Sequence, residues 1–133
     1  MTASINIMSM GWIPQLLFKL SGANMQSTSD QVFTPIAYSG SNYAVTNIIA
    51  RQRTGGASVT CAGGIYDTAS KGGNALVSAA QSWVTLASGI MVTATLAALT
   101  GTTLLSNTPI LSLTTGSTAA CTADFYIFGV DLT

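Results

Sequence analysis

The stretch that decides the fold lies near the C-terminus, at Cys121–Leu132, and reads CTADFYIFGVDL. Its centre, Phe125–Phe128, is an unbroken run of aromatic and β-branched residues, the types that favour strands. A continuous apolar run of this kind is typical of a central strand that is buried on both faces of a sheet. The sequence therefore predicts a β-sheet built around this segment.

Upstream of this segment, short apolar stretches alternate with turns rich in Gly, Ser and Asn. Pro35 predicts an edge strand or a bulge, and Gly63-Gly64 predicts a bulge or kink in a strand. Leu76, Ala79, Ala80 and Trp83 recur at helical spacing, so Ala75–Leu86 is the one stretch expected to form a short helix. The expected strands are Val32–Tyr38, Tyr43–Arg53, Ser58–Tyr66, Ile90–Leu96, Thr103–Leu105, Ile110–Thr114 and Cys121–Leu132.

This spacing of about seven to eight short strands predicts an all-β fold. The expected architecture is a single-domain, jelly-roll-like β-sandwich with an N-terminal arm. We place the arm and a polar linker at residues 1–30 and the sandwich at residues 31–133. An immunoglobulin-type sandwich is not favoured, because no Trp lies in a mid-strand apolar context between the two cysteines.

The apolar part of the arm contains the candidate partner-binding residues. They are Trp12, Ile13, Leu16, Leu17 and Phe18. An exposed apolar patch of this kind is typical of an interaction surface. Three alternatives stay open: the arm docks on a partner, it docks on a neighbouring copy, or its side chains close the protein's own core.

Charge is scarce in this chain. Four basic and four acidic side chains sum to zero, although 48% of the residues are hydrophobic. A neutral and weakly charged surface favours association over colloidal solubility. The composition therefore predicts a protein that packs against other copies of itself or against another protein.

The inventory of side chains argues against catalysis. The chain has no His and no Glu, so the usual proton-transfer groups and the Ser-His-Asp and Cys-His arrangements are missing. Two cysteines supply only half of the four ligands usual in structural zinc sites. Asp67, Lys71, Asp124 and Asp131 are expected at surface turns and strand ends, not as metal ligands. We expect no enzyme activity, no cofactor and no metal.

Nucleic-acid binding and membrane insertion are not expected either. Arg51 and Arg53 form the only basic cluster, and on a strand they would share one face, as at a solvated edge or in an ion pair. The apolar stretch Leu86–Leu99 is too short for a membrane span. Met1–Leu20 lacks a basic region ahead of its apolar residues, so it is not expected to be a signal peptide. Synthesis in a reducing cytoplasm favours free thiols, although Cys61 and Cys121 could pair if they lie on neighbouring strands.

Several phrases of the sequence resemble one family. Tyr43–Ile49 (YAVTNII), Ala62–Tyr66 (AGGIY), Ala69–Gly73 (ASKGG) and Ala123–Leu132 (ADFYIFGVDL) are similar to small structural proteins of tailed bacteriophages. The closest resemblance is to jelly-roll head decoration, or cement, proteins. It extends from the first predicted strand to the C-terminal residues, and the residues before Asp30 have no part in it.

The resemblance implies a structural virion protein. Such a protein binds the outer shell of a phage head, bridges capsid subunits and opposes the pressure of packaged DNA. The implied partners are the major capsid protein and further copies of this chain, with a trimer slightly preferred over a dimer. The implied location is the capsid exterior, after synthesis in the host cytoplasm.

Two alternatives stay open. The first is a fibre or spike module that binds a receptor, with Tyr38, Tyr43 and Tyr66 as an exposed patch. The second is a carbohydrate-binding or adhesin-like sandwich, which would need an export signal.

Overall fold

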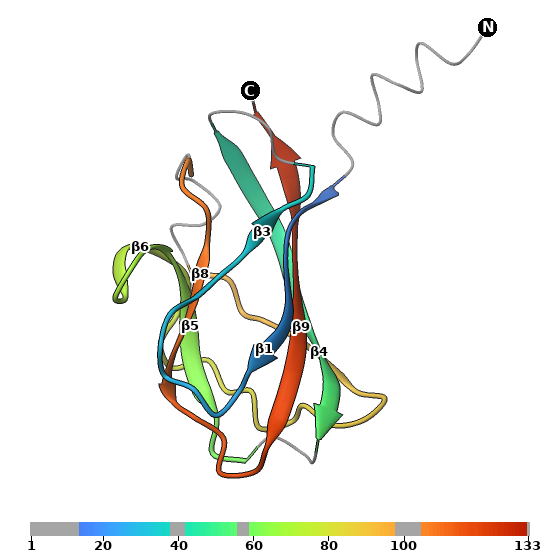
Figure 1. Ribbon diagram of the computed structural model, residues 1–133. Coiled ribbons are helices and arrows are strands. Elements are labelled where there is room, and N and C mark those ends of the chain that lie inside the picture. Colours follow the sequence, from blue (N-terminus) through green and yellow to red (C-terminus); the bar gives the residue numbers. More distant parts are fainter. Residues whose placement is uncertain (1–13, 38–41, 56–58, 98–104, 133) are drawn as a thin grey trace, which may run out of the picture.

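The fold is a sandwich of two antiparallel β-sheets (Figure 1). The computed structural model describes residues 14–37, 42–55, 59–97 and 105–132. Five strands form one sheet, in the order β3-β1-β9-β4-β7, and four form the other, in the order β2-β8-β5-β6. The strands are β1 (Gln15–Asn24), β2 (Gln31–Val32), β3 (Thr34–Pro35), β4 (Tyr43–Gly55), β5 (Ala62–Thr68), β6 (Gly72–Val77), β7 (Met91–Thr93), β8 (Ile110–Thr115) and β9 (Cys121–Asp131).

The connectivity is that of a jelly roll, as the sequence predicts. When the two-residue strand β3 is set aside, the sheets read β1-β9-β4-β7 and β2-β8-β5-β6. The first strand therefore lies beside the last, and the chain changes sheets at each step except the β5–β6 hairpin. The prediction of an all-β sandwich is confirmed, with β3 as an additional short edge strand.

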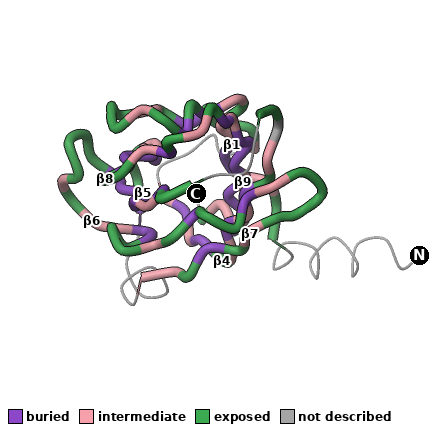
Figure 2. Tube along the Cα trace, turned by 90° about the horizontal axis from the view of Figure 1, so that it is seen from below, coloured by how far each residue is buried: buried purple, intermediate pink, exposed green. Residues whose placement is uncertain are grey.

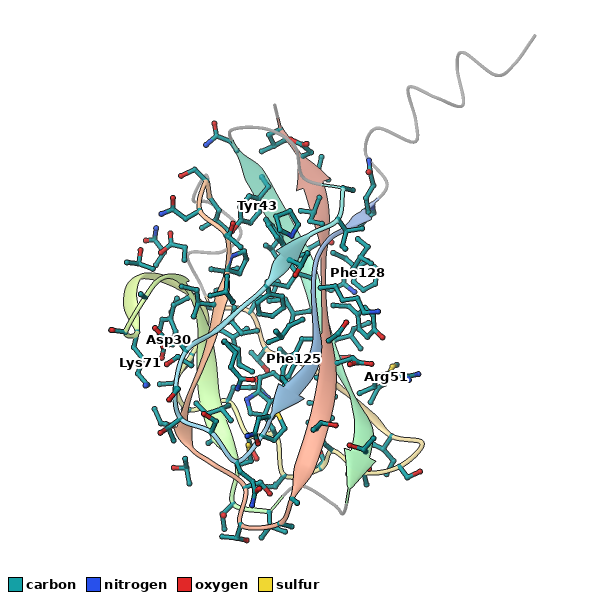
Figure 3. All side chains as sticks on the ribbon, viewed as in Figure 1. Asp30, Tyr43, Arg51, Lys71, Phe125 and Phe128 are labelled. Carbon is teal, nitrogen blue, oxygen red and sulfur yellow. The ribbon has the colours of Figure 1, made fainter. Side chains whose placement is uncertain are left out.

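The decisive segment forms β9, the middle strand of the five-stranded sheet. It pairs with β1 on one side and with β4 on the other. Its side chains alternate: Phe125 and Ile127 are fully buried, whereas Tyr126, Phe128 and Val130 are half-buried. Figure 3 shows Phe125 between the two sheets and Phe128 on the opposite face. The central position is as predicted, but only one face of the strand is fully covered.

The core fills the space between the sheets. Its largest fully buried side chains include Trp83, Tyr43, Phe18 and Phe125. Trp83 packs edge-on against Phe125, with ring centroids 5.1 Å apart, and Phe18 packs edge-on against Tyr43 at 4.9 Å. In Figure 2 the buried positions lie along the strands of both sheets, and the exposed positions gather in the connecting turns.

The short helix expected at Ala75–Leu86 is wrong, and the described residues contain no helix. This stretch begins inside β6, which ends at Val77, and then continues through turns. Leu76, Trp83 and Leu86 are buried and enter the core from a strand and its following turns, whereas Ala79 and Ala80 are exposed. The helical spacing of Leu76 and Trp83 therefore does not reflect a helix. Leu76 lies near the end of β6, and Trp83 lies in the turns that follow it.

The boundary expected at residue 30 also differs from the structure. Strand β1 lies within the five-stranded sheet, between β3 and β9, so the sandwich includes residues that we assigned to an arm. Residues 1–13 of that arm lie outside the described residues. Two local predictions are confirmed: Pro35 lies in the edge strand β3, and the register shifts between Ala62 and Gly63.

Candidate functional site

The candidate site is the side of the five-stranded sheet that faces away from the second sheet. Residues opposite one another on antiparallel strands point to the same face, so the register identifies its members. The pairs Leu16–Phe128, Lys19–Tyr126, Ile49–Tyr126 and Arg51–Asp124 belong to it. We call this surface the outer face. Its members are Leu16, Lys19, Asn47, Ile49, Arg51, Met91, Thr93, Asp124, Tyr126, Phe128 and Val130.

Aromatic and aliphatic side chains occupy the middle of the outer face. Tyr126 on β9 lies between Lys19 on β1 and Ile49 on β4, and Phe128 lies between Leu16 and Asn47. All six are half-buried, so they are only partly covered by their neighbours. The exposed face of an antiparallel sheet is ordinarily polar, whereas this one carries Leu16, Ile49, Tyr126 and Phe128 among its polar residues.

The charged groups of the outer face are engaged within the chain. Lys19 Nζ lies 5.4 Å from the centre of the Tyr126 ring, which is a cation–π contact. Arg51 Nε lies 3.8 Å from Asp124 Oδ2, and the Asp124 side chain is only 7% exposed. The main-chain N–H of Gly22 donates a hydrogen bond to Asp124 Oδ1 at 2.8 Å. The outer face therefore carries two cations and one anion, each with an intramolecular partner.

The edge of the outer face is formed by the three-residue strand β7. Met91 is 63% exposed there, and Ile90 beside it is also exposed. A shallow hollow of about 390 Å³ lies at this edge, lined by Arg51, Gln52, Gly89, Ile90 and Met91. A short edge strand limits pairing with other sheets, so contact through this region would use side chains and not the main chain.

The structure divides the five predicted partner-binding residues. Trp12 and Ile13 lie outside the described residues. Leu16 lies on the outer face, opposite Phe128. Leu17 and Phe18 are both fully buried, because the register between β1 and β9 shifts at this point. Leu17 and Phe18 therefore help to close the protein's own core, which was the alternative that the sequence left open.

Sequence reasoning did not identify Ile49, Tyr126 and Phe128 as surface residues. Tyr126 and Phe128 were assigned to the core because the Phe125–Phe128 run has no polar residue to mark an exposed face. The available signal was the period of two along β9, in which the small residues Ala123 and Gly129 and the buried Phe125 and Ile127 share one parity.

The tyrosines proposed for a receptor-binding patch do not form one. Tyr43 is fully buried, and its hydroxyl donates a hydrogen bond to the main-chain oxygen of Asn107 at 2.7 Å. Tyr66 is 6% exposed, and burial raises the pKa of its hydroxyl. Tyr38 lies outside the described residues.

A second polar cluster lies on the four-stranded sheet, where Figure 3 places Asp30 near Lys71. Lys71 Nζ donates a hydrogen bond to Ser112 Oγ at 3.0 Å, and the main-chain N–H of Ser70 donates one to Asp30 Oδ2 at 2.7 Å. A Ser–Lys pair can act as a nucleophile and base when the hydroxyl is accessible. Ser112 is fully buried, so this cluster instead fastens the β5–β6 turn to the rest of the sheet.

No group of three or more Asp, Glu, His or Cys residues is placed to bind a metal within the described ranges. Cys61 and Cys121 are both buried, and they form no disulfide bond with each other. In the part of the chain that the structure describes, no helix is long and apolar enough to cross a membrane. Comparison of the chain with protein-family models, with curated proteins and with solved structures gives no match.

Proposed function

We propose that this chain is a structural protein of a tailed-bacteriophage virion, a decoration or cement protein that binds the outside of the head. It bridges neighbouring subunits of the major capsid protein and stabilises the shell as a homo-oligomer. In this proposal it performs no catalysis and needs no cofactor, nucleic acid or membrane.

The observation that carries the proposal is a nearly uncharged jelly roll whose five-stranded sheet presents Ile49, Tyr126 and Phe128 on its outer face. A decoration protein requires area and not chemistry. Each copy can make a modest contact because many copies on a repeating lattice act together. Hydroxyl and amide side chains suit such contacts, because they form hydrogen bonds without the desolvation cost of a buried charge.

The shell contact is assigned in this proposal to Trp12 and Ile13. These two residues precede β1 in the sequence, whereas Leu17 and Phe18 are buried in the core and Leu16 lies on the outer face. Three-fold positions of a lattice favour a trimer over a dimer of this chain.

The fibre or spike module is the alternative. The burial of Tyr43 and Tyr66 removes two of the three tyrosines on which that alternative rested. A low copy number of this chain in the virion would still favour the fibre or spike module.

The first test is quantitative mass spectrometry of particles purified from the source of this sequence. A copy number comparable with that of the shell protein supports decoration. A few copies per particle would transfer the proposal to a fibre or spike, and complete absence from particles would overturn a virion role.

The second test is binding of the purified chain to heads that lack it. The double variant Trp12→Ser/Ile13→Ser should remain folded and lose binding. Val84→Ser is the matched control, because Val84 is an exposed aliphatic side chain outside both candidate surfaces. Binding by the double variant at the level of the control would contradict this shell contact.

A further inference from the structure

We propose that the outer face of the five-stranded sheet binds the outer face of a second copy of this chain, around a two-fold axis. This inference deepens the homo-oligomer of the proposed function and rests on it for its role in a virion. The contact itself would exist whether or not the chain decorates a shell.

The first argument is the contrast between the two sheets. The outer face carries Leu16, Ile49, Tyr126 and Phe128, all half-exposed. The corresponding side of the four-stranded sheet holds Gly64, Tyr66, Ile110 and Ser112, because Gly64 pairs with Ser112 and Tyr66 pairs with Ile110. Gly64, Tyr66 and Ser112 are already buried within the chain, so the middle of this side has little surface left to cover. The outer face instead leaves aromatic and aliphatic side chains half-exposed, and these gain from the removal of water.

The second argument is that the charged groups of the outer face already have partners within the chain. Lys19 lies over the Tyr126 ring and Arg51 is paired with Asp124, so each copy brings one net positive charge, that of Lys19, into the contact. A two-fold axis that lies in the plane of the contact, parallel to the strands and midway between Tyr126 and Ile49, places each Lys19 about one and a half strand spacings from the axis. The two Lys19 residues are then about 14 Å apart, which exceeds the Debye length of about 8–10 Å, so salt screens their repulsion.

The same axis brings unlike side chains together. It places Ile49 of one copy over Tyr126 of the second copy, and Tyr126 over Ile49 of the second copy. Such reciprocal contacts are the rule in a two-fold interface, where one patch serves both partners. An aliphatic side chain packed on an aromatic ring is a favourable contact at the centre of an interface.

The third argument is area. Strands β1, β9, β4 and β7 lie about 4.8 Å apart, and the outward positions of β9 from Thr122 to Val130 span about 27 Å. The flat footprint is therefore roughly 500 Å² on each copy. This footprint is smaller than the ~800 Å² per partner of a standard interface, and falls in the range of weak, transient contacts. We therefore expect a weak dimer whose population rises with protein concentration.

A face that pairs with itself closes at two copies, so this contact favours the dimer over the trimer preferred from sequence. The two states differ in mass and are separated by sedimentation equilibrium of the full chain over a micromolar concentration series.

The test compares the dissociation constant of the full chain with that of three variants, each of which adds one positive charge. Ile49→Lys should weaken the dimer at least about tenfold, because the dimer holds the substitution twice at its centre. Val84→Lys and Val32→Lys are the controls, since both side chains are exposed aliphatics outside the outer face, and they should leave the dimer unchanged. Far-UV circular dichroism confirms that each variant remains folded.

A crosslinking measurement keeps the proposal falsifiable if Ile49→Lys does not fold. In Ile49→Cys, a short bismaleimide should link two chains, whereas Val32→Cys should give no linked product. The native Cys61 and Cys121 are buried and do not compete in the folded protein.

Three outcomes would overturn the inference. The full chain could be monomeric throughout the series, or its oligomer could survive Ile49→Lys. Removal of residues 1–13 could also create a dimer that the full chain does not form, which would mean that the chain's own N-terminal segment covers the face. A dimer that is absent from virions would remove the decoration role and leave this contact standing, and a monomer that still decorates heads would do the reverse.

Discussion

The indole Nε1 of Trp83 donates a hydrogen bond to the main-chain oxygen of Gly63, 3.1 Å away in the interior of the sandwich. Two main-chain hydrogen bonds flank it: Trp83 N–H donates to Cys61 O at 2.8 Å, and Gly63 N–H donates to Gln81 O at 3.0 Å. The turns that follow β6 are thus fastened to the bulged start of β5 by a fully buried side chain.

Trp83→Phe should lower the free energy of unfolding by about 2–3 kcal/mol. The substitution leaves the buried oxygen of Gly63 without this donor and opens a small cavity beside Phe125. Urea denaturation followed by far-UV circular dichroism measures the loss. Val84→Ala is the control and should change stability by less than about 0.5 kcal/mol, because that side chain is exposed. Equal stability of Trp83→Phe and the control would contradict this role of the indole.

Asp124→Ala and Arg51→Ala should differ in their effect on stability. Asp124 is 5% exposed and accepts a hydrogen bond from Gly22 N–H, so its removal should cost about 2–3 kcal/mol. The Arg51 side chain is 60% exposed, so loss of its ion pair should cost less than about 1 kcal/mol. The measurement is urea denaturation of both variants. Equal losses would show that the ion pair, and not the hydrogen bond to Gly22, makes Asp124 important.

The position of β9 at the centre of its sheet was predictable because hydrophobic content is visible in sequence. Which of its faces is covered was not, since Tyr126 and Phe128 are as apolar as their buried neighbours. The extent to which each face of β9 is covered depends on its neighbours β1 and β4. Their register with β9 brings Lys19 and Ile49 beside Tyr126. Those pairings join residues 107 and 77 positions apart in the sequence and leave no local pattern.

The misassigned helix and arm have a common physical cause. At Ala75–Leu86 apolar residues recur at helical spacing, and the apolar residues Leu16, Leu17 and Phe18 were assigned to an arm as an exposed patch. In the folded chain, turns and a register shift interrupt the regular alternation, so Trp83 and Leu17 both reach the core from irregular positions. Strand bulges and turns that depend on tertiary contacts cannot be recognised from spacing alone. Gly63-Gly64 was the exception, because paired glycines mark the site themselves.

Cys61 and Cys121 should remain thiols, and their reaction with a thiol reagent such as DTNB should require unfolding. Both are buried, and Cys61 Sγ lies 3.6 Å from the main-chain oxygen of Met25. Buried structural cysteines are inert, because a reagent in solution does not reach the sulfur. The native protein should therefore show no rapid reaction, and the denatured protein should show both thiols. A denatured protein without reactive thiols would show that the two cysteines pair after all.

Stability should fall in acid partly through Asp30. The hydrogen bond from Ser70 N–H lowers the pKa of Asp30 below 3.8, with the Ser112 hydroxyl and the charge of Lys71 acting in the same direction. A carboxyl whose pKa is depressed on folding stabilises the native state above its unfolded pKa, and this contribution is lost as the pH falls through the folded pKa. The effect matters locally because Ser70 and Lys71 adopt left-handed φ angles of 59° and 60°, which Asp30 helps to hold.

Asp30→Asn should therefore lower the urea midpoint at pH values near neutrality, and the difference from the unsubstituted chain should shrink as the pH falls through the lowered folded-state pKa of Asp30. Asp131→Asn is the matched control, because it removes the same charge at the far end of β9, away from the β5–β6 turn. The measurement is a series of urea denaturation curves for all three chains between about pH 7 and pH 2. A constant difference between Asp30→Asn and the unsubstituted chain over the whole range would show that the carboxylate charge of Asp30 does not contribute to the hydrogen bond from Ser70.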